Sequence, residues 1–164
     1  MSGRLYPLVP GGDRMIAYRI LPDQRLIVLS LWGATTAEEI IRLSEELRSD
    51  AAFSADYDAL VDNTHLEHPC SSEELHLLAE PRVPTVRPGA RLAVVAPTDV
   101  TYGTSRMHQQ LAEYRNPLRI EVFRDRSSAL KWLGQENAGV EGTLEGMAGG
   151  EAKGETEVAD RSDD

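Results

Sequence analysis

Residues 15–40 read MIAYRILPDQRLIVLSLWGATTAEEI, and this stretch decides the fold. Two apolar runs, residues 15–21 and 26–32, flank a short turn that contains Pro and Asp, which predicts a β-hairpin. The second run is apolar at both its odd and its even positions, so both faces of the strand need to be covered. It therefore predicts a central strand with packed layers on two sides.

A helix should follow this hairpin directly. Thr35 or Thr36 can cap its N-terminus, because each has a glutamate three residues later, which is the capping-box spacing. Further on, short apolar runs alternate with helical patterns. The later strands are expected at residues 59–61, 91–96 and 120–123, and the later helices at 72–80, 100–114 and 128–133.

The expected order is thus β-β-α-β-α-β-α-β-α, an α/β fold with an opening hairpin and helices packed on a mostly parallel sheet. Right-handed crossovers would bring the carboxyl ends of the parallel strands to one edge of the sheet, with the N-termini of the following helices. We call this edge the rim. It is where ligands usually bind in such sheets.

Composition divides the chain into three parts. Residues 1–13 are rich in Pro and Gly and are expected to form an irregular arm, and residues 14–134 form the domain. Residues 135–164 hold 2 basic and 9 acidic side chains and no Phe, Tyr, Trp or Ile. Such a segment buries too little apolar surface to offset its ordering entropy, so a disordered acidic tail is predicted.

Charge and cysteine content exclude several classes of protein. The net charge of -10 disfavours binding to nucleic acid or to an anionic membrane surface. No apolar stretch approaches the ~20 residues that span a bilayer, and a single cysteine, Cys70, allows no internal disulfide. We therefore expect a cytoplasmic protein without membrane insertion and without a cofactor. Residues 15–21 are expected at a sheet edge, which a homodimer would cover.

Several segments of the predicted domain have sequences typical of one bacterial family. They are the hairpin at 15–40, DALVD at 58–62, RLAVVAPTDVTYGTSRMHQQLAEY at 91–114 and EVFRDRSSALKWLG at 121–134. On these segments the domain resembles the SpoIIAA-like (STAS/SEC14-type) bacterial domains, which are related in fold to the anti-sigma-factor antagonists. The resemblance implies a STAS-like fold and a non-enzymatic regulatory or interaction module.

The resemblance also implies a candidate phosphorylation site. In the antagonists, phosphorylation of a serine at the N-terminus of the helix after the third strand breaks partner binding. Counting from Asp62, the equivalent residue here is Ser71, although Cys70 and Glu73 replace the aspartate and the glycine that normally flank it. Alternatively, Ser71 or Ser72 simply caps the helix.

A protein partner or a small ligand is expected to bind at the rim, where free backbone N–H groups of helix N-termini point. The candidate residues are Trp32, Asp62, Cys70, Ser71, Ser72, Thr98, Thr101, Tyr102, Ser105 and Arg106. An alternative is a SEC14-like domain that binds a small molecule or a lipid.

The segment from Asp62 to Cys70 is rich in groups that carry chemistry. A zinc site would draw on His65, His68, Cys70 and His76, but their spacing matches no familiar zinc motif, and we predict no metal site. A Cys70-dependent hydrolase is a third hypothesis, with His65 or His68 as base and a helix N-terminus that lowers the pKa of the thiol. No third catalytic residue or oxyanion hole is evident, so no catalytic set is predicted.

Overall fold

The computed structural model describes residues 2–7, 15–80, 90–115, 119–136 and 138–149. The strands in these ranges are β1 Ser2–Pro7, β2 Met15–Leu21, β3 Leu26–Ala34, β4 Asp58–His68, β5 Arg91–Val95 and β6 Arg119–Phe123. The helices are α1 Ala37–Ser49, α2 Ser72–Leu78, α3 Asp99–Arg115, α4 Arg126–Leu133 and α5 Ala138–Gly149, with a 3-10 turn at Pro22–Gln24.

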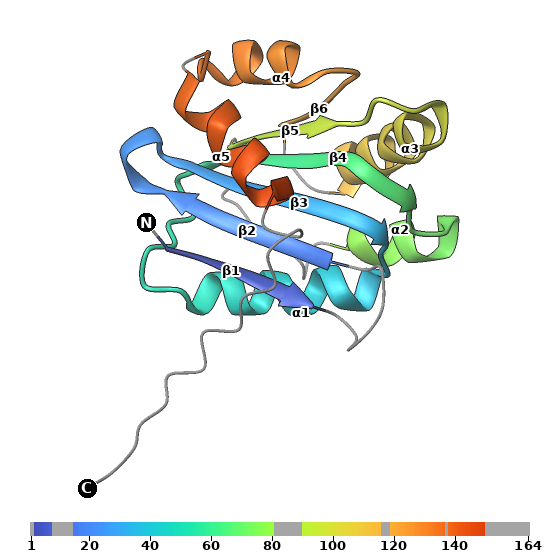
Figure 1. The fold of residues 1–164 in the computed structure, drawn as a ribbon. Coiled ribbons are helices and arrows are strands. Elements are labelled where there is room, and N and C mark those ends of the chain that lie inside the picture. Colours follow the sequence, from blue (N-terminus) through green and yellow to red (C-terminus); the bar gives the residue numbers. More distant parts are fainter. Residues whose placement is uncertain (1, 8–14, 81–89, 116–118, 137, 150–164) are drawn as a thin grey trace, which may run out of the picture.

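The strands form one sheet whose order is the order of the chain, β1-β2-β3-β4-β5-β6 (Figure 1). The first two pairings are antiparallel, and the three pairings from β3 to β6 are parallel. β2 and β3 form the predicted hairpin, closed by the 3-10 turn and by Arg25 in the left-handed conformation (φ 52°). The expected mostly parallel α/β fold is confirmed.

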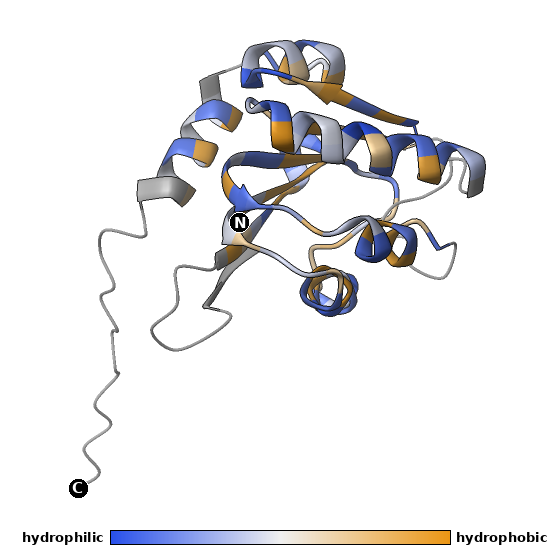
Figure 2. Ribbon diagram, turned by 90° about the vertical axis from the view of Figure 1, so that its right-hand side faces the viewer, coloured by the Kyte–Doolittle hydropathy of each residue, from blue (hydrophilic) through white to orange (hydrophobic). Residues whose placement is uncertain are grey.

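Helices cover both faces of the sheet, α1, α2 and α3 on one side and α4 and α5 on the other (Figures 1 and 2). β3 contributes to both apolar cores, as its sequence predicted. Leu26, Val28 and Trp32 pack in the core shared with α4 and α5, while Ile27 and Leu31 pack in the core shared with α1 and α3. None of the described helices is long and apolar enough to cross a membrane.

The N-terminal arm differs from expectation. Residues 2–7 form β1, which pairs with Met15 to Ile20 of β2, although the Pro and Gly content of residues 1–13 predicted an irregular arm. β2 exposes a full row of backbone N–H and C=O groups, and pairing with β1 satisfies them. β2 is therefore not an edge strand, and the argument for a homodimer that covers it no longer applies.

The C-terminal segment also differs from expectation. Residues 138–149 form α5, although disorder was predicted from residue 135. Val140, Leu144 and Met147 recur at helical spacing and are at most 2% exposed. They pack in one core with Leu26, Val28 and Trp32 of β3. Three apolar residues are enough to hold this helix in place, because the sheet supplies the other half of the core. The remainder of the predicted tail, residues 150–164, lies outside the described residues.

Deleting residues 135–164 should lower the melting temperature by more than about 5 °C, because it removes α5 and uncovers the apolar face of β3. Deleting only residues 150–164 is the control and should leave the melting temperature nearly unchanged. Differential scanning calorimetry distinguishes the two. If the variant that lacks residues 135–164 melts at the same temperature as the full chain, α5 does not pack on the sheet.

Candidate functional site

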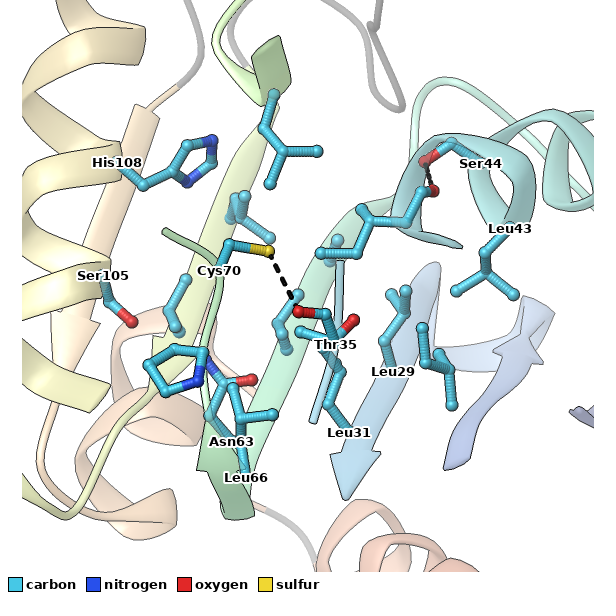
Figure 3. A pocket seen from close by; sticks show the side chains of 18 of the residues that line it. Leu29, Leu31, Thr35, Leu43, Ser44, Asn63, Leu66, Cys70, Ser105 and His108 are labelled. Carbon is cyan, nitrogen blue, oxygen red and sulfur yellow. Dashed lines mark hydrogen bonds between the residues drawn. The ribbon is translucent and has the colours of Figure 1, made fainter. Parts of the chain in front are cut away.

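A cavity of about 170 Å³ lies between the sheet and helices α1, α2 and α3 (Figure 3). Most of the side chains that line it are aliphatic, and they come from β2 to β5 and from all three helices. No Lys, Arg, Asp or Glu is among the lining residues in the described part of the chain. A mostly apolar space of this size suits an apolar ligand.

The floor of the cavity is formed by neighbouring positions on the central strands. Leu29 of β3 pairs with Val61 of β4, and Ala59 of β4 pairs with Leu92 of β5. Leu29, Val61 and Leu92 are only partly buried, although they sit on the central strands of the sheet, where apolar side chains are normally covered. The seven-residue helix α2 lines the cavity with Leu75 and Leu78 but leaves these three side chains partly exposed.

Two buried polar atoms among the lining residues lack a hydrogen-bond partner in the described structure. They are the Oγ1 atom of Thr35, just after β3, and the Oδ1 atom of Asn63, on β4. Ser105 and His108 line the cavity from α3. Burial lowers the pKa of His108, so its imidazole is uncharged at neutral pH and can both donate and accept a hydrogen bond.

Cys70 also lines the cavity and is buried. Its thiol donates to the carbonyl oxygen of Thr35, with an Sγ···O distance of 3.7 Å. Burial, and then the nearby carboxylate of Glu74, raises the pKa of the thiol to about 12. The expectation that a helix N-terminus lowers the pKa of this thiol is therefore wrong, because desolvation outweighs the field of the short helix α2. Without a thiolate at neutral pH, Cys70 lacks the nucleophile that the hydrolase hypothesis requires.

Ser71 and Ser72 lie at the start of α2, are exposed, and do not line the cavity. Ser71 is the N-cap, and its Oγ atom accepts a hydrogen bond from Glu74 N at 3.3 Å. Glu74 in turn accepts from Ser71 N at 2.8 Å and from Ala37 N at 3.2 Å, so one carboxylate joins the N-termini of α1 and α2. These backbone hydrogen bonds hold the pKa of Glu74 below its usual value.

The rim residues at the start of α3 already have interaction partners within the protein. Thr98 Oγ1 accepts from Thr101 N at 3.1 Å and lies 2.8 Å from the hydroxyl of Thr101. The guanidinium of Arg124 lies 4.0 Å above the ring of Tyr102, and Arg106 donates to the side-chain oxygen of Gln109. These predicted rim residues therefore have structural partners. Of the ten candidate residues for binding at the rim, only Cys70 and Ser105 line the cavity.

Asp62 and Trp32 face the opposite side of the sheet. Arg126 of α4 donates to Asp62 Oδ2 from Nε at 2.9 Å and forms a salt bridge with it through a second nitrogen at 2.7 Å. Thr64 N donates to Asp62 Oδ1 at 3.0 Å. The Trp32 ring stacks on the imidazole of His65, with the ring centroids 6.4 Å apart. Neither Asp62 nor Trp32 belongs to the cavity.

The strand expected at residues 59–61 is longer in the structure, where β4 begins at Asp58 and continues to His68 alongside the end of β3. Irregular register at Ser30/Trp32 and Gly33/Ala34 accommodates the extension. His65, His68 and His76 are exposed whereas Cys70 is buried. Among the described residues, no group of three His, Cys, Asp or Glu side chains could hold a metal ion.

Sequence reasoning did not select Thr35, Asn63 or His108 as site residues. Thr35 was considered only as a helix cap, a role that Thr36 fills. Asn63 was not selected because the strand was expected to end before it. Only when the strand continues past Asp62 does the side chain of Asn63 point to the same face of the sheet as that of Val61. For His108 the sequence did offer a signal: it lies three residues after Ser105, a spacing that places both side chains on the same face of a helix.

The Cys70 thiol should resist iodoacetamide at pH 7.5 in the folded protein, because a thiol with a pKa of about 12 has almost no thiolate at that pH. Mass spectrometry should find the intact chain unlabelled after a time that fully labels the protein in urea. Equal rates of labelling in the two states would show that the thiol is neither buried nor protonated.

Replacement of Arg126 by Met should destabilise the protein by about 3 kcal/mol, because it leaves the carboxylate of Asp62 buried without its ion partner. Urea unfolding measures the change. The matched control is Arg42→Met, which breaks an exposed pair with Glu38 and should cost well under about 1 kcal/mol. Similar losses for both variants would contradict the structural role of the Asp62–Arg126 pair.

No model of a known protein family matches the sequence, and no curated protein matches it. Among solved structures, the chain is similar to an uncharacterised protein of the DUF3478 family with a SpoIIAA-like fold, from Shewanella loihica PV-4. The two share 21% sequence identity with a TM-score of 0.51, over 76% of this chain and 98% of that chain. At this identity the similarity concerns the fold. The strand and helix order and this structural similarity together show that the chain has a SpoIIAA-like fold.

Proposed function

We propose that the protein is a non-enzymatic binding module that holds an apolar small molecule in the cavity between the sheet and helices α1–α3. The observation that carries this proposal is the partial exposure of Leu29, Val61 and Leu92 on the central strands. A dry apolar cavity of about 150 Å³ suffices to bind benzene, and this cavity is larger, at about 170 Å³.

The polar side chains at the rim already form hydrogen bonds within the protein, which favours the cavity as the binding site. Ser71, Thr98 and Asp125 each accept a hydrogen bond from a backbone N–H in the first turn of a helix, so their oxygens are already engaged as caps. Thr35 Oγ1 and Asn63 Oδ1, by contrast, have no described partner. Binding of a protein partner at the rim is therefore the weaker proposal, and a SEC14-like small-molecule domain is the stronger one.

The condition of the reactive groups supports a role without catalysis. Cys70 is protonated at neutral pH, and Asp62 is held by Arg126 on the opposite face of the sheet. Neither group is then available as a nucleophile or general base.

Two serines of α1 offer a matched test. Ser44 lines the cavity and Ser49 is exposed, yet each hydroxyl donates to the carbonyl four residues earlier, Ile40 O at 2.9 Å and Glu45 O at 3.1 Å. Both replacements by Leu remove that hydrogen bond and add the same volume. Only Ser44→Leu places the added volume in the cavity.

We expect the uncharged fluorescent probe N-phenyl-1-naphthylamine to bind the wild type and Ser49→Leu with equal affinity. Ser44→Leu should weaken binding at least about tenfold, because the added side chain occupies the space of the ligand. Circular dichroism establishes that both variants are folded. No probe binding to the wild type, or equal binding to all three proteins, would disprove the cavity as the site.

A further inference from the structure

We infer that the ligand of the cavity is an uncharged amphiphile, whose apolar part lies over Leu29 and Val61 and whose polar group faces Ser105 and His108. This inference rests on the proposed function and adds the chemical class of the ligand. Three properties of the cavity carry it: the unequal polarity of its two walls, the unused hydrogen-bonding capacity of four of its polar side chains, and the lack of Lys, Arg, Asp and Glu among the described lining residues.

The cavity has two unlike walls (Figure 3). On the side of α1 and β3 the lining is mostly aliphatic, with Leu29, Leu31 and Leu43, and the hydroxyls of Thr35 and Ser44 also lie there. On the side of α3 it holds the imidazole of His108 and the hydroxyl of Ser105. A ligand that is apolar at one end and polar at the other matches both walls, whereas a pure hydrocarbon would leave the polar wall without partners.

Four polar side chains of the cavity, those of Thr35, Asn63, Ser105 and His108, keep unused hydrogen-bonding capacity in the described structure. Neither Ser105 nor His108 has a side-chain hydrogen bond to another described residue. The side chains of Thr35 and Asn63 are 6% and 9% exposed, and their Oγ1 and Oδ1 atoms lack partners. A buried polar atom without a partner costs free energy, and a ligand that supplies a donor recovers it.

The charge around the cavity sets the charge of the ligand. No Lys, Arg, Asp or Glu is among the lining residues that the structure describes, so a bound carboxylate or phosphate would meet no counter-ion from these residues after losing its water. Glu74 and Glu39 lie close enough to Cys70 to disfavour its thiolate, so the local field also opposes an anion. Hydroxyl, amide and ester groups meet neither penalty.

Competition against N-phenyl-1-naphthylamine at pH 8 tests this class with two ligands of equal chain length. 1-Octanol should displace the probe, and octanoate, which is ionised at pH 8, should bind at least about 100-fold more weakly because its charge is buried without a partner. Octanoate that competes within threefold of 1-octanol would overturn the inference. Failure of the probe itself to bind would instead remove the proposed function.

Variants of His108 test the position of the polar group. His108→Leu should weaken 1-octanol about fivefold, the equivalent of one lost hydrogen bond, while the affinity for the probe stays within twofold. His76→Leu, which changes an exposed histidine of α2, should alter neither affinity.

His108→Lys adds a cation to the polar wall and should tighten octanoate binding at least about tenfold relative to the wild type. A merely structural role for His108 would not produce this gain. If His108→Leu binds 1-octanol as the wild type does and His108→Lys gives no gain for octanoate, the polar group does not face α3 and the inference fails.

Discussion

The burial of β3 on both of its faces is the constraint on which the rest of the structure depends. A strand that is apolar at successive positions is stable only between two packed layers. The chain provides one layer with α1, α2 and α3 and the other with α4 and α5. The two layers cover the sheet unequally. The layer that contains the seven-residue helix α2 does not cover its face of the sheet completely, and the uncovered space is the cavity.

The cavity has an energetic cost that the fold bears without a ligand. Apolar surface left uncovered forfeits about 25 cal/mol per Å², and Leu29, Val61 and Leu92 are each partly uncovered. Two unpartnered polar oxygens, on Thr35 and Asn63, add a further cost. A ligand that binds only the folded state stabilises it in proportion to the logarithm of its concentration. Stability and occupancy are therefore coupled in this protein.

The sequence allowed prediction of those elements whose cause is local. The hairpin, the alternation of strands and helices, and the caps at Thr35 or Thr36 and at Ser71 or Ser72 were all predicted from patterns a few residues long, and the structure assigns the two caps to Thr36 and Ser71. Such patterns act through neighbours in the chain, so one sequence suffices to read them.

The elements that were missed depend on partners far away in the chain. β1 forms because β2 offers it an edge, and α5 because β3 offers it an apolar face. The extension of β4 to His68 depends on pairing with the end of β3. The cavity is less local still, because it is the space that three helices leave uncovered, and no residue pattern encodes that space directly.

The strand order has a consequence for how the chain folds. Each strand after the first pairs with the strand that precedes it in the chain, so the sheet can grow by successive addition of strands during synthesis. The cover of β3 by α5 is the exception, because Leu144 packs against a strand more than 100 residues earlier in the chain. Until the ribosome has released α5, one apolar face of the central strand is open to other chains, and this is the interval in which aggregation competes with folding.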